Sequence, residues 1–331
     1  MKQPMVSPKP WWPMEVGFFL IPVAAFFLFP LHLPLITEMM ILALFAVSLD
    51  LVLGYAGIVS LGHAAFFGLG AYAAGILAQQ GWGEPLSGLV FAAAVAGVVG
   101  LLTGVLVLRG SDLTRLMVTL GIGMMLFEAA NKMNWLTGGA DGLQGVMVEP
   151  LLGAFQFDIF GHTAFWYAYA GLVVLFYVAR RLVHSPFGLC LRGIKTNRLR
   201  MSALGSRVNL HLLAVYTVGA MMAGIAGGLL AQTTQFVSLD VLSFERSAEV
   251  LLVLVLGGPG RLYGGIIGAV AFTVMHEVLS GFTTHYWQFW LGLVLVLLVL
   301  FARGGLLGLV DALRKRAARG TASAAAPERA A

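Results

Sequence analysis

The chain has 331 residues, of which 59% are hydrophobic and only 11% are charged. Its mean hydropathy is +0.90. Soluble domains carry about 25% charged residues, so this composition excludes an ordinary water-soluble protein and predicts a polytopic membrane protein. The single cysteine, Cys190, excludes an intrachain disulfide and any multi-cysteine metal site.

Ten apolar runs follow one another along the chain, and most have the length of about 20 residues that a helix needs to cross a bilayer. No small-residue cleavage site follows the basic arm at 1–13, so we expect an uncleaved first helix rather than a signal peptide. The sequence therefore predicts an all-α, polytopic bundle of about ten membrane segments. The runs fall at 14–33, 36–55, 60–79, 86–108, 116–136, 163–183, 209–231, 247–257, 264–280 and 286–302.

Charged residues divide the loops into two kinds. Seven Lys or Arg and no acid lie between Arg180 and Arg207, and six more basic residues follow from Arg303 onward. The loop at 137–162 has three acidic residues and no Lys or Arg. Because basic residues stay on the cytoplasmic side, we expect both termini and the loop at 184–208 in the cytoplasm and 137–162 on the other side. The basic tail at 303–331 ends in TASAAAPERAA, which predicts partial disorder.

Two glycine-rich stretches interrupt the apolar pattern. The run at 247–257 would rise about half the thickness of a bilayer core, and it ends in GGPGRLYGG (257–265), where Pro259 breaks the helix. GYAGIVSLGHAAFFG (54–68) brackets a reversal of the same type. Since backbone groups at such a break cannot face lipid, we expect two glycine-interrupted hairpins packed inside protein, one in each half of the chain.

Known catalytic patterns are missing from the sequence. His276-Glu277 opens a zinc-protease motif, but Ser280 stands where the second histidine would be. The sequence also lacks a phosphate-binding loop and a G-x-S-x-G motif. We therefore expect no catalytic residue, no metal site, no cofactor and no nucleic-acid partner.

Polar residues inside apolar runs are costly and commonly face the bundle interior or a transport pathway. Asp50 and His63 flank the first glycine-rich turn, and we expect them to form structural hydrogen bonds or, alternatively, to contact substrate. Glu128 stands four residues before Lys132, a spacing that predicts a local ion pair.

The stretch SPFGLCLRGIKTNRLRMSALGSRVNLH (185–211) is far longer than a turn between two runs requires. It begins with Pro186 and Gly188, and Gly205 closes its helix-forming part, so it predicts one short basic helix on the cytoplasmic face. Such a helix suits docking to a partner protein. A basic loop that lies on membrane lipid is the alternative.

Four stretches resemble, in the same order, the permease subunits of branched-chain amino acid ABC importers. LTGGADGL and the basic loop are more similar to the LivM type than to its LivH partner, and the resemblance extends over roughly residues 36–310. The four stretches are GYAGIVSLGHAAFFGLGAY (54–72), VTLGIGMMLFEAANKMNWLTGGADGLQG (118–145), SPFGLCLRGIKTNRLRMSALG (185–205) and GGPGRLYGGIIGA (257–269).

The resemblance implies a type II ABC importer-like permease domain at 14–302 in the bacterial inner membrane, with 137–162 in the periplasm. It implies four further subunits: a homologous second permease, two cytoplasmic ATPase subunits and a periplasmic solute-binding protein. The substrate would be a branched-chain or related amino acid, while urea, short amides and aromatic acids fit the same family. A self-sufficient secondary transporter or channel is the alternative class, and it would need a coupling-ion site of its own.

The resemblance also assigns residues to two sites. The loop at 184–208 would couple to the ATPase, although Arg200, Met201 and Ser202 depart from the family pattern that Ala203-Leu204-Gly205 keeps. The expected coupling residues are Gly188, Arg192, Lys195, Arg198, Arg200, Ala203, Leu204 and Gly205. The expected pathway residues are Asp50, Gly54, Gly57, Ser60, His63, Phe66, Thr119, Glu128, Gly257, Gly258 and Gly260.

Overall fold

The structure is a computed structural model that describes residues 13–282 except 152, 154 and 159, together with 289–290, 292–293, 296 and 305–308. The expected arm at 1–13, the last apolar run at 286–302 and the tail at 303–331 lie wholly or mostly outside the described residues. Apart from two isolated β-bridges, the described residues form helices and their connections. The predicted all-helical architecture is confirmed.

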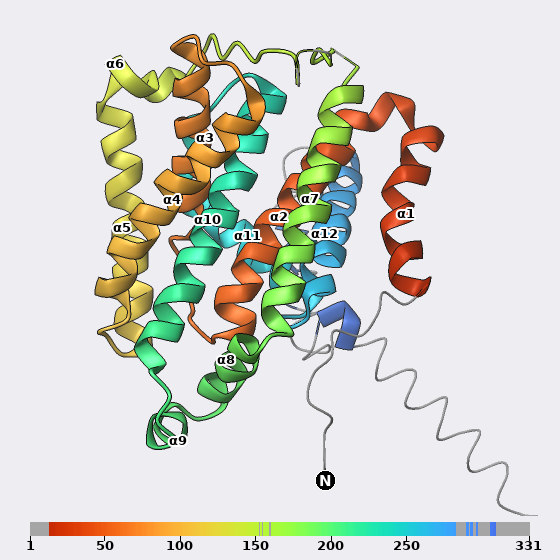
Figure 1. Cartoon of the computed structure of the whole chain (residues 1–331). Helices are drawn as coiled ribbons and strands as arrows, with labels where there is room; N and C mark the ends of the chain where they lie inside the picture. Colours follow the sequence, from red (N-terminus) through yellow and green to blue (C-terminus); the bar gives the residue numbers. More distant parts are fainter. Residues whose placement is uncertain are drawn as a thin grey trace, which may run out of the picture.

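The long helices stand side by side as a bundle, and short helices lie at both of its ends (Figure 1). The longer helices are α1 (Pro13–Leu28), α2 (Leu33–Leu49), α3 (His63–Gln79), α4 (Pro85–Val107), α5 (Asp112–Lys132), α7 (His162–Val183), α10 (Val208–Thr234), α11 (Phe244–Gly257) and α12 (Leu262–Phe282). The shorter elements are η1 (Pro30–His32), the π-helical turn η2 (Asp50–Tyr55), α6 (Asn134–Thr137), η3 (Gly139–Asp141), α8 (Pro186–Thr196), α9 (Arg198–Ala203) and η4 (Leu239–Leu242).

Within the described part of the chain, six helices are long and apolar enough to cross a membrane. The other long helices are shorter than a full span: α1 has 16 residues, α3 has 17 and α11 has 14. The structure therefore fits a transmembrane helical bundle but does not confirm the count of ten segments. The six spans are Pro30–Tyr55, Pro85–Val107, Asp112–Lys132, His162–Val183, Val208–Thr234 and Leu262–Gly281.

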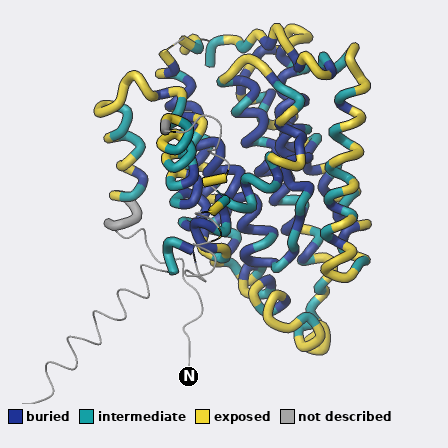
Figure 2. The backbone as a smooth tube through the Cα atoms, turned by 180° about the vertical axis from the view of Figure 1, so that it is seen from behind, coloured by how far each residue is buried: buried dark blue, intermediate teal, exposed yellow. Residues whose placement is uncertain are grey.

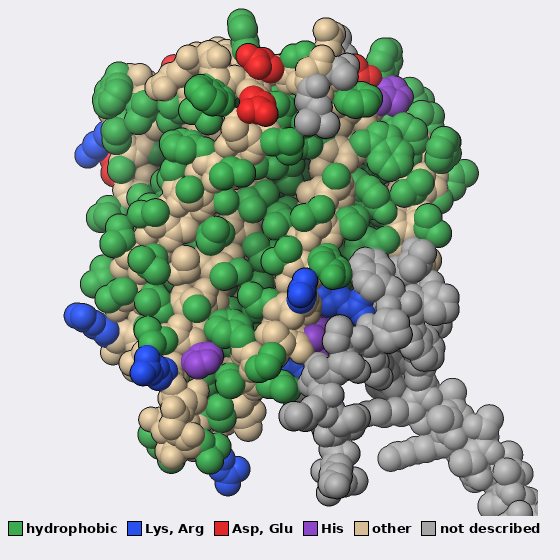
Figure 3. Space-filling model, viewed as in Figure 1, with side chains coloured by type: hydrophobic (Ala, Val, Ile, Leu, Met, Phe, Trp, Pro, Cys, Tyr) green, Lys and Arg blue, Asp and Glu red, His purple; other side chains and the backbone are tan. Residues whose placement is uncertain are grey.

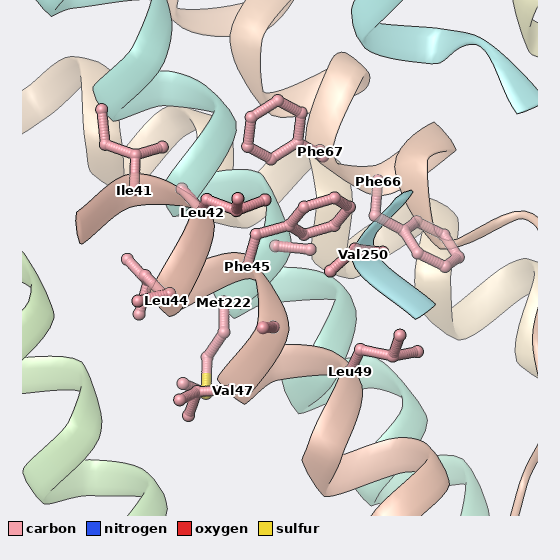
Figure 4. Packing of buried hydrophobic residues seen from close by; sticks show 14 of the residues in the cluster. Ile41, Leu42, Leu44, Phe45, Val47, Leu49, Phe66, Phe67, Met222 and Val250 are labelled. Atoms are coloured by element: carbon pink, nitrogen blue, oxygen red, sulfur yellow. The ribbon is translucent and has the colours of Figure 1, made fainter. Parts of the chain in front are cut away.

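The centre of the bundle is formed by α2, α3 and α10. α10 packs most extensively on α3 and α4, while α2 contacts α7, α10 and α12. Figure 2 shows that the buried residues lie in this middle region, and Figure 4 shows Phe45 of α2 beside Phe67 of α3. Their ring centroids are 4.5 Å apart. A Cβ at Gly70 of α3 would collide with the backbone of Gly224 on α10, so small residues allow these helices their close approach.

The two ends of the bundle differ in charge. Asp and Glu side chains lie at the upper end in Figure 3, whereas most of the visible Lys and Arg side chains lie in the lower half. We call the end with α8 and α9 the basic end, and the end with the loop at 138–161 the acidic end. This separation agrees with the charge pattern of the sequence, in which 137–162 has no Lys or Arg.

Candidate functional site

The first glycine-rich turn begins as a widened helix end. Asp50–Tyr55 is a π-helical turn that continues α2, and the amide of Ala56 donates to the carbonyl of Leu51, five residues earlier, at 3.3 Å. Such turns are rare and frequently lie at functional sites. Gly57 then has φ +72°, which glycine adopts without steric cost, and the chain reverses into α3 at His63.

The second glycine-rich turn joins α11 to α12. α11 ends at Gly257, the chain reverses through Gly258 at φ +106° and Gly260 at φ +83°, and α12 begins at Leu262. The two helices pack against each other as a hairpin. A Cβ at Gly257 would collide with the carbonyl of Gly264, so the tight crossing requires glycine. α11 begins three residues earlier than the expected run at 247–257.

The structure brings these two turns together. Oδ1 of Asp50 accepts a hydrogen bond from the backbone N–H of Gly260 at 2.6 Å. A Cβ on Gly54 would lie only 2.5 Å from the same backbone nitrogen, so a larger residue at position 54 would push the two turns apart. Asp50 is fully buried, and its Oδ2 has no hydrogen-bond partner among the described residues.

A third segment, α8, contacts the first turn from the basic end. The ammonium of Lys195 donates to the carbonyl of Gly54 at 2.6 Å. One turn earlier, the guanidinium of Arg192 lies over the ring of Tyr55, 5.3 Å from its centroid. We call Asp50, Gly54, Gly260 and Lys195 the turn junction. Sequence analysis assigned its members to two separate sites, and the structure places them in contact.

The basic loop forms two short helices rather than the single one that its sequence predicts. Asn197 adopts an extended conformation after α8, and its side chain accepts a hydrogen bond from the amide of Arg200 at 2.9 Å, which caps α9. Gly188 packs against the backbone of Val183 and holds α8 close to the end of α7. Arg198 lies 3.8 Å from Asp112 at the start of α5.

α9 projects from the bundle as an exposed tip (Figures 1 and 2). Leu199 and Leu204 are 85% and 74% exposed, and Arg200 and Ala203 are exposed as well. Gly205 ends the tip at φ +82°, with nothing within 4 Å of where its Cβ would lie. Sequence analysis did not select Leu199, although an apolar residue between arginines in an amphipathic loop is a signal for it.

His63 joins α3 to α2 deep inside the bundle. Its Nε2 lies 2.9 Å from Oγ of Ser48, whose own proton is donated to the carbonyl of Phe45 at 2.6 Å. Nε2 must therefore be the donor, and Nδ1 is a buried acceptor without a hydrogen bond among the described residues. His63 also stacks on the ring of Phe45.

The neighbours of His63 are buried too. Oγ1 of Thr119 on α5 accepts a hydrogen bond from the amide of Leu61 at 3.2 Å, and Phe66 contacts the ring of Tyr216 edge to face. Ser60 is 1% exposed. The hydrogen bond from Leu61 ties the loop at 56–62 to α5, and Ser60, His63 and Thr119 are all buried in this conformation.

Glu128 lies apart from the turns, near the acidic end of α5. It forms the predicted pair with Lys132 at 3.3 Å, and its side chain is 54% exposed. Glu128 borders a groove of about 600 Å³ between α5 and α11, which we call the α5–α11 groove. Glu245, Ser243 and Ser247 add polar groups to its wall, and Met124 is among its apolar residues.

α5 forms one outer side of the bundle (Figure 1). Only three of its 21 residues are buried within the chain: Arg115, Thr119 and Ala130. Met117 and Met125 are each 67% exposed on its outer surface. The outer surface of α5 is therefore largely apolar, and the adjoining groove carries the carboxylates of Glu128 and Glu245.

Sequence analysis missed an ion pair at the beginning of α11. Nη1 of Arg246 lies 2.7 Å from Oε2 of Glu249, and the guanidinium carbon of Arg246 is 5.7 Å from the centroid of the Phe67 ring. Ser247, between them, accepts a hydrogen bond from the amide of Ala64 at 3.0 Å. The Arg-x-x-Glu spacing ahead of an apolar run was a usable signal for this pair.

Comparisons with known proteins place these features in context. A family model described as the permease component of branched-chain amino acid transport systems matches residues 32–301. The chain is 31% identical, over 299 residues, to the high-affinity branched-chain amino acid transport system permease protein LivM of Salmonella typhimurium strain LT2, covering 82% of this chain and 68% of LivM.

Two other relatives are similarly distant. LivM of Escherichia coli strain K12 is 30% identical, with the same coverage of both chains. The autoinducer 2 import system permease protein LsrC of Enterobacter sp. strain 638 is 30% identical over 243 residues, covering 69% of this chain and 66% of LsrC. No solved structure matches the chain.

Proposed function

Because the chain belongs to the permease family of branched-chain amino acid transport systems, we propose that it is the membrane-spanning subunit of an ABC importer for branched-chain or related amino acids. The match over residues 32–301 carries this proposal, since that range contains both glycine-rich turns, the basic loop and the α5–α11 groove. In this proposal the chain makes and breaks no covalent bond. ATP hydrolysis belongs to a separate chain.

The proposed orientation puts the basic end in the cytoplasm and the acidic end in the periplasm of a bacterial inner membrane. The charge separation between α8–α9 and the loop at 138–161 supports it. The proposed count of ten segments would add α1, α3, α11 and the run at 286–302 to the six full-length spans. α11 would then be a re-entrant segment, because 14 residues rise only about 21 Å.

The α9 tip is the proposed docking site for an ATPase subunit. Leu199 and Leu204 expose apolar surface at the basic end, and Arg198 and Arg200 surround it with charge. Because α9 projects beyond the end of the bundle (Figure 1), its exposed apolar pair favours a protein partner over the alternative of a basic loop that lies on membrane lipid. The tip is also built on α8, which contacts the first turn directly.

The proposed pathway runs along the α5–α11 groove, between this chain and a homologous second permease. A carboxylate such as Glu128 is costly against lipid and normally faces protein or a water-filled cavity. The exposed α5 surface would therefore be covered in the assembled importer, and Thr119, Ser60 and His63 would lie behind the wall of the pathway. A periplasmic binding protein would deliver substrate at the acidic end.

Reconstitution of the complete importer tests the proposal. Liposomes that contain this chain, its second permease and the ATPase pair should accumulate leucine when ATP and the binding protein are supplied. This chain alone should neither hydrolyse ATP nor accumulate leucine. Concentrative uptake by the chain alone, with or without a proton gradient, would instead establish a secondary transporter. Because LsrC is named for autoinducer 2 import, competition by urea, amides, aromatic acids and autoinducer 2 should be measured in the same liposomes.

A further inference from the structure

The turn junction links parts of the chain that have different roles in the proposed function. α8 belongs to the loop that would receive the ATPase, and the two glycine-rich turns lie inside the permease. We propose that Lys195 and Asp50 are positioning residues that couple movement of α8 to the opening of both turns. This inference rests on the proposed function, since it assumes that an ATPase moves the α8–α9 loop.

The side chains of Lys195 and Asp50 form hydrogen bonds with backbone groups that have no helical partner where the helices break. In a regular helix the amide of Ile58 would bond to the carbonyl of Gly54, but here it donates to Val52 at 3.0 Å. The ammonium of Lys195 supplies the missing partner. On the other turn, the amide of Gly260 precedes the start of α12, where amides lack helical acceptors, and the carboxylate of Asp50 accepts from it.

Close packing makes the two hydrogen bonds depend on each other. Asp50, which bonds Gly260, and Gly54, which is bonded by Lys195, belong to the same π-helical turn. The two residues therefore move together. The stem of Lys195 also covers Gly57, where a Cβ would lie 3.1 Å from Cγ of the lysine. α8 therefore cannot withdraw from the bundle without either releasing the carbonyl of Gly54 or pulling on the first turn.

The position of Lys195 in its loop suits transmission of movement. It lies two residues before Asn197, where α8 gives way to α9. The residue is exposed at the basic end, while its ammonium reaches inward to Gly54. A displacement of the α9 tip would thus reach the junction through the last turn of α8, and a released Gly54 would weaken the contact of the first turn with the second.

Uncoupling in the complete importer is the first test. Lys195→Met should keep ATP hydrolysis and assembly but raise the ratio of ATP hydrolysed to leucine transported by about tenfold or more, since tenfold is the lower limit for the loss of one hydrogen bond to a charged group. Lys195→Arg, which keeps a donor, should restore most of the coupling. Arg109→Met, which removes an exposed cation at the same end of the bundle, should leave the ratio unchanged. An unchanged ratio in Lys195→Met, or the same rise in Arg109→Met, would overturn the inference.

Cross-linking tests the geometry without relying on transport. Cβ of Lys195 lies 3.8 Å from where a Cβ on Gly57 would be, within the range that a disulfide spans. In a Cys190→Ser background, Gly57→Cys/Lys195→Cys should form a disulfide in the assembled importer. Its rate should differ severalfold between the nucleotide-free complex and one trapped with ATP and vanadate. An equal rate in both states would refute the coupling, and because Gly57 has a positive φ, the comparison is made on the fraction of complexes that do form the disulfide. Failure of the proposed function would appear separately, as absence of ATP-driven uptake by the unaltered importer.

Discussion

Asp50 and Lys195 show how single side chains allow a helix to break inside a membrane protein. Each bonds a backbone group that a continuous helix would have satisfied internally. In hydrocarbon an unsatisfied group of this kind costs several kcal/mol, so the glycine-rich turns depend on these two partners. His63 joins helices through a side chain instead, because its hydrogen bond to Oγ of Ser48 ties α3 to α2.

Replacement of Asp50 tests this dependence at one residue. Asp50→Ala leaves the part-buried amide of Gly260 without its acceptor, which should lower the free energy of unfolding by about 1–3 kcal/mol. Asp50→Asn keeps an acceptor oxygen and should lose much less. Asp141→Ala, at an exposed position in the loop of the acidic end, is the matched control. Thermal unfolding in detergent measures all three, and equal melting temperatures for Asp50→Ala and Asp141→Ala would show that the hydrogen bond is dispensable.

Two glycines offer a matched test of the α9 tip. Gly205 and Gly81 both have positive φ, +82° and +90°, and both have open space where a Cβ would lie. The backbone strain of a tryptophan should therefore be similar at the two sites, about 1 kcal/mol. Gly205→Trp should lower substrate-stimulated ATP hydrolysis by the complete importer severalfold, because it obstructs docking, while Gly81→Trp should not. Normal stimulation in Gly205→Trp would mean that the ATPase docks elsewhere.

The bounds of the helices show how well hydropathy and capping residues predict individual elements. Hydropathy predicted a run at 86–108, and α4 spans Pro85–Val107. α5 begins four residues before its predicted run, because Ser111 caps it and Asp112 belongs to its first turn. The break at Asn197 was missed since its capping hydrogen bond competes locally with a continuous helix.

The turn junction was beyond prediction for a different reason. Asp50 and Gly260 are 210 positions apart, and Lys195 and Gly54 are 141 apart. Glycine and proline mark where each turn occurs, but neither periodicity nor spacing states which turns will meet. Both Lys195 and the turn glycines were selected from the sequence, and only the packing of α8 and α11 relates them.

The orientation of the two ends can be tested by labelling. In a Cys190→Ser background, Gln144→Cys in the loop of the acidic end should react with a membrane-impermeant maleimide in cells whose inner membrane is intact. Leu204→Cys at the α9 tip should react only after that membrane is opened. Both positions are exposed in the structure, so access to the reagent decides the result. Labelling in the opposite order would invert the proposed topology.

At the scale of the whole molecule, the α5 surface is where we propose that the second permease binds, since only three of the 21 residues of α5 are buried within the chain. Met117 on α5 and Leu102 on α4 are similarly exposed, 67% and 63%. In the Cys190→Ser importer, Met117→Cys should form a cross-link to the second permease with a short bifunctional reagent. Leu102→Cys should not, because we expect the exposed apolar surface of α4 to face lipid. Cross-linking from Leu102→Cys but not from Met117→Cys would show that the subunit contact lies on α4 and not on α5.

The hydrogen bond between Asp50 and Gly260 also sets an order of events during biosynthesis. The ribosome adds roughly 5–20 residues per second, so about 10–40 s separate synthesis of the carboxylate from synthesis of its donor 210 residues later. Throughout that interval the carboxylate of Asp50 lacks the donor that Gly260 will supply. Entry of the α11–α12 hairpin is then the step that completes the first turn. A nascent chain that stops before residue 260 would keep that carboxylate without its backbone donor.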